Sequence, residues 1–319
     1  MKKLSIVVPC WNEEGALPIF FDAMEEVEKT LKKRVEIEYV LVNDGSKDRT
    51  LEIFRELHQK DARIHYFSFS KNFGKEAAMY AGLEHATGDY VVLMDVDLQD
   101  PPELLPVMLD GIEKEGYDCI ATKSTSRHGY SFLRKTFTKW FYRIVTKVSK
   151  TEMIPGARDF RMMKRVMVDA VVDLREYNRY TKGLFSFVGF DTKWIEYENR
   201  DRTVGKSRFD FKWLFSYGIE AIVSFSTAPL VVAAFIGVLF CLIAFVMIVI
   251  IIVKTLVWGD PVSGWPSLVC ILFLVSGIQL FCTGIIGEYL AKTYLETKKR
   301  PLYILKETDE TYEKPNAKV

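Results

Sequence analysis

The sequence has few cysteines and almost no net charge. Five cysteines occur among its 319 residues, widely spaced and without a CxxC pair. A disulfide framework or a zinc site is therefore not expected, and a reducing compartment is favoured. Lys and Arg number 43 and Asp and Glu number 42, which gives a net charge of +1. This balance lacks the basic field that binding to nucleic acid requires, so we expect no nucleic-acid partner.

Two further signals are missing near the N-terminus. Lys2 and Lys3 precede an apolar run, residues 4–8, that is too short for a signal peptide, so we expect a strand there and no leader. The letters PCWNE follow this strand, where a dinucleotide-binding fold would have GxGxxG. Without those glycines a pyrophosphate cannot approach the backbone closely, which argues against a dinucleotide cofactor.

Two long segments, by contrast, carry no charge at all. They are residues 230–253 and 265–287. Each exceeds the roughly 20 residues with which a helix spans a bilayer. Two buried helices of a soluble domain are the alternative, but core helices rarely run this long without a charge. We therefore expect transmembrane helices at 229–254 and 265–290.

Basic residues lie on the outer sides of this pair. They cluster at 202–212 and 292–300, whereas the short loop between the spans carries Lys254 balanced by Asp260. The positive-inside rule then places both outer flanks in the cytoplasm. We expect a multi-pass protein of the plasma (inner) membrane with a large cytoplasmic N-terminal domain and a cytoplasmic C-terminal tail, 291–319.

Residues 1–125 alternate between the patterns of strands and helices. This rhythm predicts an α/β fold with a mostly parallel, Rossmann-like sheet and helices on both faces. Ligands of such sheets bind beyond the carboxyl ends of the strands. Asp100, followed by two prolines, is expected to cap the last of these helices. The predicted strands are 4–8, 36–42, 64–69, 90–94 and 118–122, and the predicted helices lie near 16–33, 48–60, 75–86 and 102–116.

Two later segments have the pattern of amphipathic helices. Residues 132–150 contain basic and aromatic side chains but no acidic one. A helix of this kind suits an interface with anionic membrane lipids. A solvated helix that covers the sheet is the alternative. Residues 209–228 form a second candidate, a juxtamembrane amphipathic helix that leads into the first span.

Acidic side chains follow two of the predicted strands. Asp44 follows the second strand, and Asp95 and Asp97 follow the fourth. Strand alternation would point Asp95 and Asp97 to the same side, where two carboxylates suit Mg²⁺ or Mn²⁺ bridged to a diphosphate. Such a metal would offset the charge that develops on a leaving group. A lone DxD is a weak signal, but Asp44 is expected at the same edge of the sheet.

Six short motifs occur in a fixed order along the chain: PCWNEE, VNDGS, KNFGKEAAM, MDVDLQDPPE, GARDFRMM and RDRTVGKSR. Together they resemble the family 2 glycosyltransferases, which have a GT-A fold. The resemblance is closest to the polyisoprenyl-phosphate glycosyltransferases, such as dolichol-phosphate mannose synthase and the bactoprenol glucosyltransferases. It covers roughly residues 1–215, so we expect a GT-A domain at 1–208, and the paired spans match the bactoprenol branch.

The resemblance also implies roles for single residues. Those expected to bind the nucleotide-sugar are Pro9, Trp11, Glu13, Asp44 and Asp95. Those expected around the metal, Mg²⁺ or Mn²⁺, are Asp95, Asp97 and Gln99. Those expected around the donor and acceptor phosphates are Arg127, Arg134, Arg200 and Lys206. Each of these basic residues has the alternative of being a solvated or headgroup-facing side chain.

Asp159 matches the proposed catalytic base of the family, although it could instead be a structural partner of Arg158 or Arg161. Its chemistry favours a different role. A phosphate monoester has its second pKa near about 6, so near neutral pH it is already largely a dianion and needs little proton abstraction. We therefore expect Asp159 to position a substrate, with Lys or Arg charge beside it to prevent repulsion of the acceptor.

The sequence lacks the Q/RxxRW motif that processive polymerases of this family carry. Single transfer is therefore expected: inverting transfer of one sugar, glucose from UDP-glucose by the closest resemblance, to undecaprenyl phosphate. The resemblance also suggests membrane lipids as partners and a homo-oligomer, a tetramer in related proteins. Transfer of another sugar, transfer to another lipid such as a diacylglycerol, and a non-catalytic membrane scaffold are the alternatives. The intact carboxylates Asp44, Asp95, Asp97 and Asp159 count against a scaffold.

Overall fold

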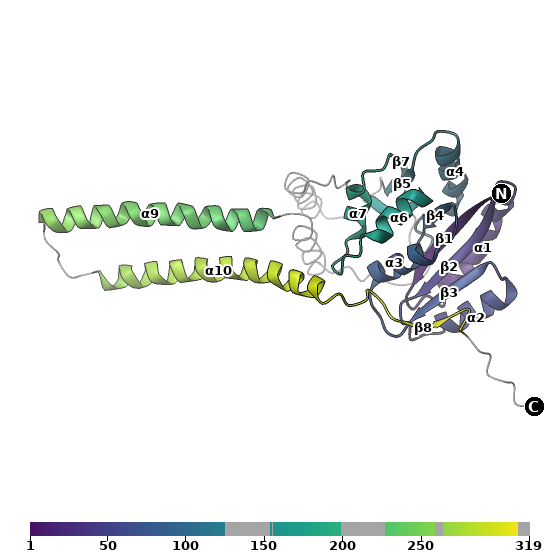
Figure 1. Ribbon diagram of the computed structural model, residues 1–319, viewed down its shortest axis with the longest axis horizontal. Coiled ribbons are helices and arrows are strands. Elements are labelled where there is room, and N and C mark those ends of the chain that lie inside the picture. The colour runs from purple at the N-terminus through teal and green to yellow at the C-terminus, as the bar shows by residue number, and fades with distance from the viewer. Residues whose placement is uncertain (125–153, 155, 199–226, 259–263, 312–319) are drawn as a thin grey trace, which may run out of the picture.

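One mixed sheet forms the centre of the N-terminal domain (Figure 1). The computed structural model describes residues 1–124, 154, 156–198, 227–258 and 264–311. Within these residues the sheet has eight strands in the order β7-β5-β6-β4-β1-β2-β3-β8. The strands are β1 Lys2–Cys10, β2 Val35–Asn43, β3 Ile64–Phe69, β4 Tyr90–Leu93, β5 Cys119–Ser124, β6 Ala157–Lys164, β7 Thr192–Tyr197 and β8 Leu305–Thr308.

Most neighbouring strands run parallel, as the sequence predicts. β1 pairs in parallel with β2 and β4, and β2 pairs in parallel with β3. The exceptions are β6, which is antiparallel to β4 and β5, and β8, which is antiparallel to β3. The start of β6 therefore lies at the same edge of the sheet as the carboxyl ends of its neighbours.

Helices cover both faces of the sheet because the central strands are apolar on both sides. In β1, Leu4 and Ile6 pack into the core beneath α1, α2 and α4, whereas Val7 packs into the core beneath α3, α6 and α7. The helices of the domain are α1 Ala16–Leu31, α2 Thr50–Lys60, α3 Lys75–His85, the 3₁₀ helix η1 Pro102–Leu104, α4 Leu105–Glu113, α6 Arg165–Asp173 and α7 Thr181–Phe187. The predicted strands and helices of residues 1–125 are confirmed.

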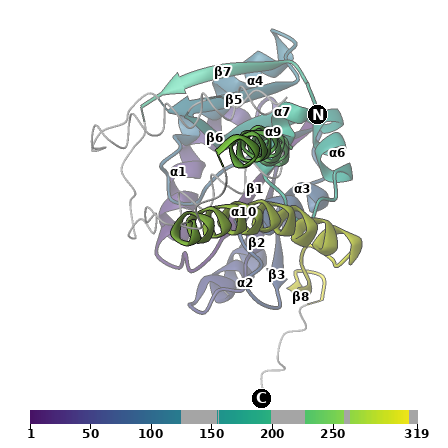
Figure 2. The same ribbon diagram turned by 90° about the vertical axis from the view of Figure 1, so that its left-hand side faces the viewer.

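Two long apolar helices, α9 (Ala228–Trp258) and α10 (Trp265–Thr297), extend from the domain as a hairpin (Figure 1). Figure 2 views the pair nearly end on, against the sheet domain. Both are long and apolar enough to cross a membrane, over Pro229–Met247 and Ile271–Thr297. Their apolar side chains are mostly exposed, as expected of helices that face lipid. The predicted amphipathic helix 132–150 lies outside the described residues, as does nearly all of 209–228.

The chain returns to the sheet after the hairpin. α10 ends at Thr297, and β8 then pairs with β3. Glu307 on β8 accepts hydrogen bonds from both Nε (2.8 Å) and a terminal nitrogen (2.6 Å) of Arg55 on α2. Tyr303 stacks on Phe69 with ring centroids 4.9 Å apart. The segment that the sequence predicts as a tail thus contributes an edge strand to the N-terminal sheet domain.

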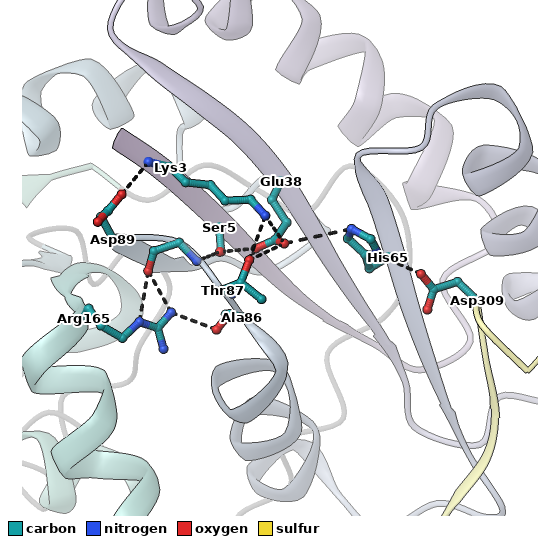
Figure 3. Close-up of polar contacts among 10 residues, drawn as sticks. Lys3, Ser5, Glu38, His65, Ala86, Thr87, Asp89, Arg165 and Asp309 are labelled. Carbon is teal, nitrogen blue, oxygen red and sulfur yellow. Dashed lines mark hydrogen bonds and ion pairs between the residues drawn. The ribbon is translucent and has the colours of Figure 1, made fainter. Parts of the chain in front are cut away.

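A buried carboxylate joins β1, β2 and the segment that follows α3 (Figure 3). Glu38 on β2 lies opposite Ser5 of β1 and accepts a hydrogen bond from its hydroxyl. Lys3 Nζ lies 2.7 Å from Glu38 Oε1, and the Thr87 hydroxyl donates to the same oxygen at 2.8 Å. Burial opposes ionisation of Glu38, but these hydrogen bonds outweigh it, so its pKa lies below the ordinary value.

The same region closes the end of α3. Arg165 donates to the carbonyl oxygens of Ala86 and Gly88, both at 2.8 Å, and so satisfies acceptors beyond the last turn of the helix (Figure 3). His65 Nδ1 lies 2.7 Å from a carboxylate oxygen of Asp309. The His65 contact joins β3 to the residue after β8, whereas the Arg165 contacts fix the end of α3 that is remote from Lys75.

Replacing Glu38 with alanine is expected to lower the free energy of unfolding by about 3 kcal/mol, because it leaves Lys3 and the buried Ser5 hydroxyl without their partner. Denaturant unfolding in detergent micelles, followed by tryptophan fluorescence, would measure the change. Because the folded pKa of Glu38 is depressed, its contribution should be complete above about pH 4.3 and lost as the pH falls through the folded value. Glu36→Ala, at an exposed position of the same strand, is the control and should shift stability by less than about 0.5 kcal/mol. Equal effects of the two variants would contradict the assignment.

Candidate active site

The loops after β1 and β2 interlock at the carboxyl edge of the sheet. Asn12 has a left-handed backbone (φ 55°), its amide donates to the Ser46 hydroxyl at 2.9 Å, and its side-chain oxygen accepts from the Lys47 amide at 2.8 Å. The Glu13 amide donates to the Thr50 hydroxyl at 2.9 Å. Pro9, near the end of β1, and Trp11 are both half-buried. The structure therefore gathers Pro9, Trp11 and Glu13 next to the β2 loop, as the predicted nucleoside site requires.

Asp44, directly after β2, is buried and holds the loop that precedes α3. Its carboxylate accepts from the amides of Phe73 (2.6 Å) and Gly74 (3.0 Å) and from the Asn72 side chain (2.9 Å). Gly45 has φ +62°, and a Cβ there would lie 2.3 Å from the Lys71 carbonyl carbon. Asp44 is thus at the predicted edge, where it fixes the backbone that leads into Lys75.

Lys75 joins two of the predicted site carboxylates. It is the first residue of α3, and its Nζ lies 2.8 Å from Asp95 and 2.9 Å from Asp159. Asp95 follows β4, whereas Asp159 lies on β6, the antiparallel strand beside it. The antiparallel insertion of β6 therefore brings residues 64 positions apart in sequence, Asp95 and Asp159, to one lysine.

Asp159 is held in its ionised form. Lys182 on α7 places its Nζ 3.8 Å from Oδ1, and that oxygen is buried and has no hydrogen-bond partner among the described residues. Burial disfavours the carboxylate, but the positive charges of Lys182 and Lys75 outweigh it, so the pKa of Asp159 lies well below its ordinary value. The two lysines provide the compensating charge that the sequence analysis expects beside this residue.

Asp97 and Gln99 lie in the turn after Asp95. Asp97 is buried, and one of its oxygens accepts from the Gln99 amide at 3.1 Å. The Gln99 side-chain oxygen accepts from Arg158 at 3.2 Å. β4 ends at Leu93, so strand alternation does not set the directions of Asp95 and Asp97, and this part of the prediction is wrong. The turn sets them, with a left-handed Leu98 (φ 55°) between Asp97 and Gln99.

The donor set fits a divalent cation that shares its coordination with a substrate. Asp95 and Asp97 offer carboxylate oxygens, the ligands that Mg²⁺ and Mn²⁺ prefer. Among the described residues no group of three or more His, Cys, Asp or Glu side chains could hold a metal ion. Mg²⁺ is commonly held by one or two carboxylates, with phosphates and water completing the octahedron. The residues present therefore fit a metal that binds together with a diphosphate.

Asp100 does not cap the helix after it, contrary to the prediction. η1 begins after Pro101 without any side-chain cap. The Asp100 carboxylate instead lies 3.1 Å from Arg158 Nε and accepts a hydrogen bond from Tyr197 on β7. A guanidinium stabilises a buried carboxylate more than a helix end does, which explains why Asp100 pairs with Arg158 and does not cap the helix. Arg158 is therefore the partner of Asp100, not of Asp159.

Arg161 is buried beside this cluster. Its guanidinium lies 3.8 Å from the centroid of the Phe185 ring on α7, and it donates to the Arg158 carbonyl oxygen at 2.9 Å. Burial lowers the pKa of Arg161. Arg161 packs α7 against β6, and so the direct partners of the Asp159 carboxylate are lysines.

Four predicted phosphate-binding residues lie outside the described residues: Arg127, Arg134, Arg200 and Lys206. Lys75 and Lys182 are site residues that were not predicted from the sequence. Lys75 could have been predicted as a site residue, since it follows a strand at the same edge of the sheet and lies in the motif KNFGKEAAM. Lys182 could not have been predicted from the sequence, because its proximity to Asp159 depends on the packing of α7.

The chain resembles known proteins along nearly its whole length. Residues 5–172 match the family model described as glycosyl transferase family 2. A prophage bactoprenol glucosyl transferase homolog from Escherichia coli (strain K12) is 40% identical over 304 residues, covering 95% of this chain and 98% of the relative. A putative glycosyltransferase, CsbB, from Bacillus subtilis (strain 168) is 39% identical, covering 96% and 92%.

A solved structure shows a more distant likeness. The crystal structure of glucosyl-3-phosphoglycerate synthase from Mycobacterium tuberculosis, in complex with Mn²⁺, UDP-glucose and phosphoglyceric acid, is 16% identical, with a TM-score of 0.43, and covers 70% of this chain and 78% of that one. The match to the family model and the alignments with the full-length relatives are much stronger evidence of the family than this structural likeness. Since the family model spans more than half of the sequence and the relatives align with it almost end to end, this chain belongs to glycosyl transferase family 2.

Proposed function

We propose that this protein transfers one glucosyl residue from UDP-glucose to undecaprenyl phosphate at the cytoplasmic face of the membrane. The observation that carries the proposal is the 40% identity to bactoprenol glucosyl transferases along 95% of the chain. The architecture supports it. The sheet edge with Asp95 and Asp159 belongs to the same chain as two helices long enough to cross the membrane in which a lipid acceptor would lie.

The donor would bind across the loops after β1, β2 and β4. Pro9, Trp11 and Glu13 border the predicted nucleoside site, and Asp44 holds the adjoining loop in place through its hydrogen bonds to residues 72–74. Asp95 and Asp97 would hold Mg²⁺ or Mn²⁺ against the diphosphate. When bound there, the cation supplies positive charge that stabilises the leaving UDP.

The reaction is a single displacement at the anomeric carbon. An oxygen of the acceptor phosphate forms a bond to that carbon while the bond from the carbon to the UDP oxygen breaks, so the configuration inverts and UDP leaves. No protein nucleophile is required. The ionised Asp159, held by Lys75 and Lys182, would orient the sugar or the incoming phosphate, and the two lysines would offset its negative charge.

The hairpin gives the site its place at the membrane. α9 begins and α10 ends on the side of the sheet domain, so both attachments and the domain lie on one side of the bilayer that the helices would cross (Figure 1). The basic flanks favour the cytoplasmic side. A long isoprenoid remains in the bilayer, and its phosphate then meets the domain at the headgroup level.

Purified protein in phosphatidylglycerol-containing vesicles should convert radiolabelled UDP-glucose and undecaprenyl phosphate into an organic-soluble labelled product. Parallel reactions with UDP-N-acetylglucosamine, UDP-galactose and GDP-mannose test the sugar, and diacylglycerol tests the acceptor. Preferential transfer from another donor, or to diacylglycerol, would replace the proposed substrate. No transfer from any donor to either lipid would favour the scaffold alternative.

A further inference from the structure

The cytoplasmic end of α10 is hydrogen-bonded to the sheet domain. Glu296, in the last turn of α10, accepts from the backbone amides of Tyr177 (2.8 Å) and Asn178 (3.3 Å) through one carboxylate oxygen. Both amides belong to the loop between α6 and α7, residues 174–180. The end of a predicted transmembrane helix therefore holds the backbone that leads into α7.

This loop is also fixed from the domain side. The Arg179 guanidinium is buried, donates to the carbonyl oxygen of Val171 at 3.1 Å and to that of Leu174, and lies 4.7 Å from the centroid of the Tyr80 ring. Tyr80 belongs to α3 and Val171 to α6. The loop is thus held by contacts with α3, α6 and the end of α10. A displacement of α10 would therefore be transmitted through the loop to α7.

Adjacent residues on α7 and α3 then reach the active site. Glu76 accepts from the amide of Thr181 at 2.9 Å and from its hydroxyl, which joins the first residue of α7 to the first turn of α3. The next residue of α7, Lys182, lies 3.8 Å from Asp159, and the neighbour of Glu76, Lys75, lies 2.9 Å from it. The Glu76–Thr181 contact therefore sets the separation of the two lysines that hold Asp159.

We propose that Glu296 is a positioning residue for sugar transfer, which holds α7 so that Lys182 stays beside Asp159. The inference rests on the proposed function and adds to it a direct connection between the membrane helix and the reacting groups. The Lys182 contact is the longer of the two lysine contacts, and the Asp159 oxygen that it faces has no hydrogen bond among the described residues. Movement of α7 would thus displace Lys182 from Asp159 and change the charge around its carboxylate, while the shorter Lys75 contact is retained.

The variants separate hydrogen bonding at Glu296 from its charge. Glu296→Ala removes the oxygen that accepts both hydrogen bonds and should lower kcat about tenfold, with the donor KM unchanged, because misplacement at a reacting centre slows the chemical step. Glu296→Gln keeps a side-chain oxygen for the two amides and should stay within about twofold of the wild type. Glu288→Ala, an exposed glutamate on the same helix, is the matched control and should leave kcat unchanged.

A double-mutant cycle tests whether Glu296 acts through Lys182. Lys182→Met should itself lower kcat, and adding Glu296→Ala should cause little further loss, since the lysine that α7 positions is already gone. Multiplicative losses in the double mutant would overturn the proposal, because they would mean that the two residues act independently. The pairing of Lys182→Met with Glu288→Ala supplies the baseline of the cycle.

Hydrogen exchange gives a readout that does not depend on turnover. Amides of residues 181–187 should exchange faster in Glu296→Ala than in the wild type, Glu296→Gln or Glu288→Ala. Unchanged exchange in Glu296→Ala would also overturn the proposal. If wild-type protein transfers no sugar at all, the proposed function fails, while the exchange experiment still decides whether α10 holds α7.

Discussion

Replacing Asp159 with asparagine is expected to slow sugar transfer by about 100-fold at every pH between about 6 and 9. The loss is of the size that follows from misplacing reacting groups by about 1 Å. Asparagine keeps the shape of the side chain but loses the charge that Lys75 and Lys182 surround. Without that charge the two ammonium groups repel each other and no longer define one geometry.

The flat pH dependence follows from the electrostatics of the site. The pKa of Asp159 lies well below its ordinary value, because the two lysines outweigh the effect of burial. A group with so low a pKa is a weak base near neutral pH, where efficient general bases have pKa values close to the working pH. The acceptor phosphate, with its second pKa near about 6, is already a dianion above that pH.

The measurement is a pH–rate profile of Asp159→Asn and wild type, under conditions where the chemical step limits turnover. Asp169→Asn, at an exposed site on α6, is the control and should follow the wild type. Recovery of Asp159→Asn to nearly the wild-type rate by about pH 8–9, well above the phosphate pKa, would show that Asp159 is a base after all.

The second large effect is expected at Asp97. Asp97→Ala should lower transfer by about 1,000-fold, because it removes a proposed ligand of the cation that would stabilise charge on the leaving UDP. In the wild type, EDTA should abolish transfer and Mg²⁺ or Mn²⁺ should restore it. Restoration should fail in Asp97→Ala at the same metal concentration.

Electron paramagnetic resonance of Mn²⁺ provides a check that is independent of turnover. With UDP present, wild-type protein should bind Mn²⁺ and Asp97→Ala should bind it at least tenfold more weakly. Asp191→Ala, an exposed carboxylate on the turn before β7, should bind as the wild type does. Full activity and unchanged Mn²⁺ binding in Asp97→Ala would remove Asp97 from the metal site.

Local patterns were sufficient to predict the first half of the sheet. Strands such as β1 and β2 are rich in apolar residues and are followed by turn residues, so short windows of sequence identify them. β8 could not be found this way. Its four residues, Leu305–Thr308, include Lys306 and Glu307, and the strand forms through pairing with β3 and through the bond of Glu307 to Arg55, 252 positions away.

The site residues likewise fall into those that local sequence predicts and those whose positions depend on tertiary packing. Asp44 and Asp95 follow strands, so the topology alone places them at the carboxyl edge. Lys75 could have been included by that reasoning. Lys182 and Glu296 could not, because their positions depend on how α7 packs against the sheet and on how the end of α10 contacts the loop between α6 and α7. Asp100 shows the converse: its sequence predicts a helix cap, but Tyr197 and the half-buried Arg158 bind its carboxylate instead.

The return of the chain to β3 after the hairpin has a consequence for biosynthesis. Ribosomes make β3 early and β8 only after both apolar helices, so the sheet domain folds at first with β3 as an open edge. Such an edge can pair with other chains while it remains uncovered. Completion of the domain therefore waits for the synthesis of α9 and α10, and a nascent chain that stops before β8 would leave this edge open to quality-control proteases and to aggregation.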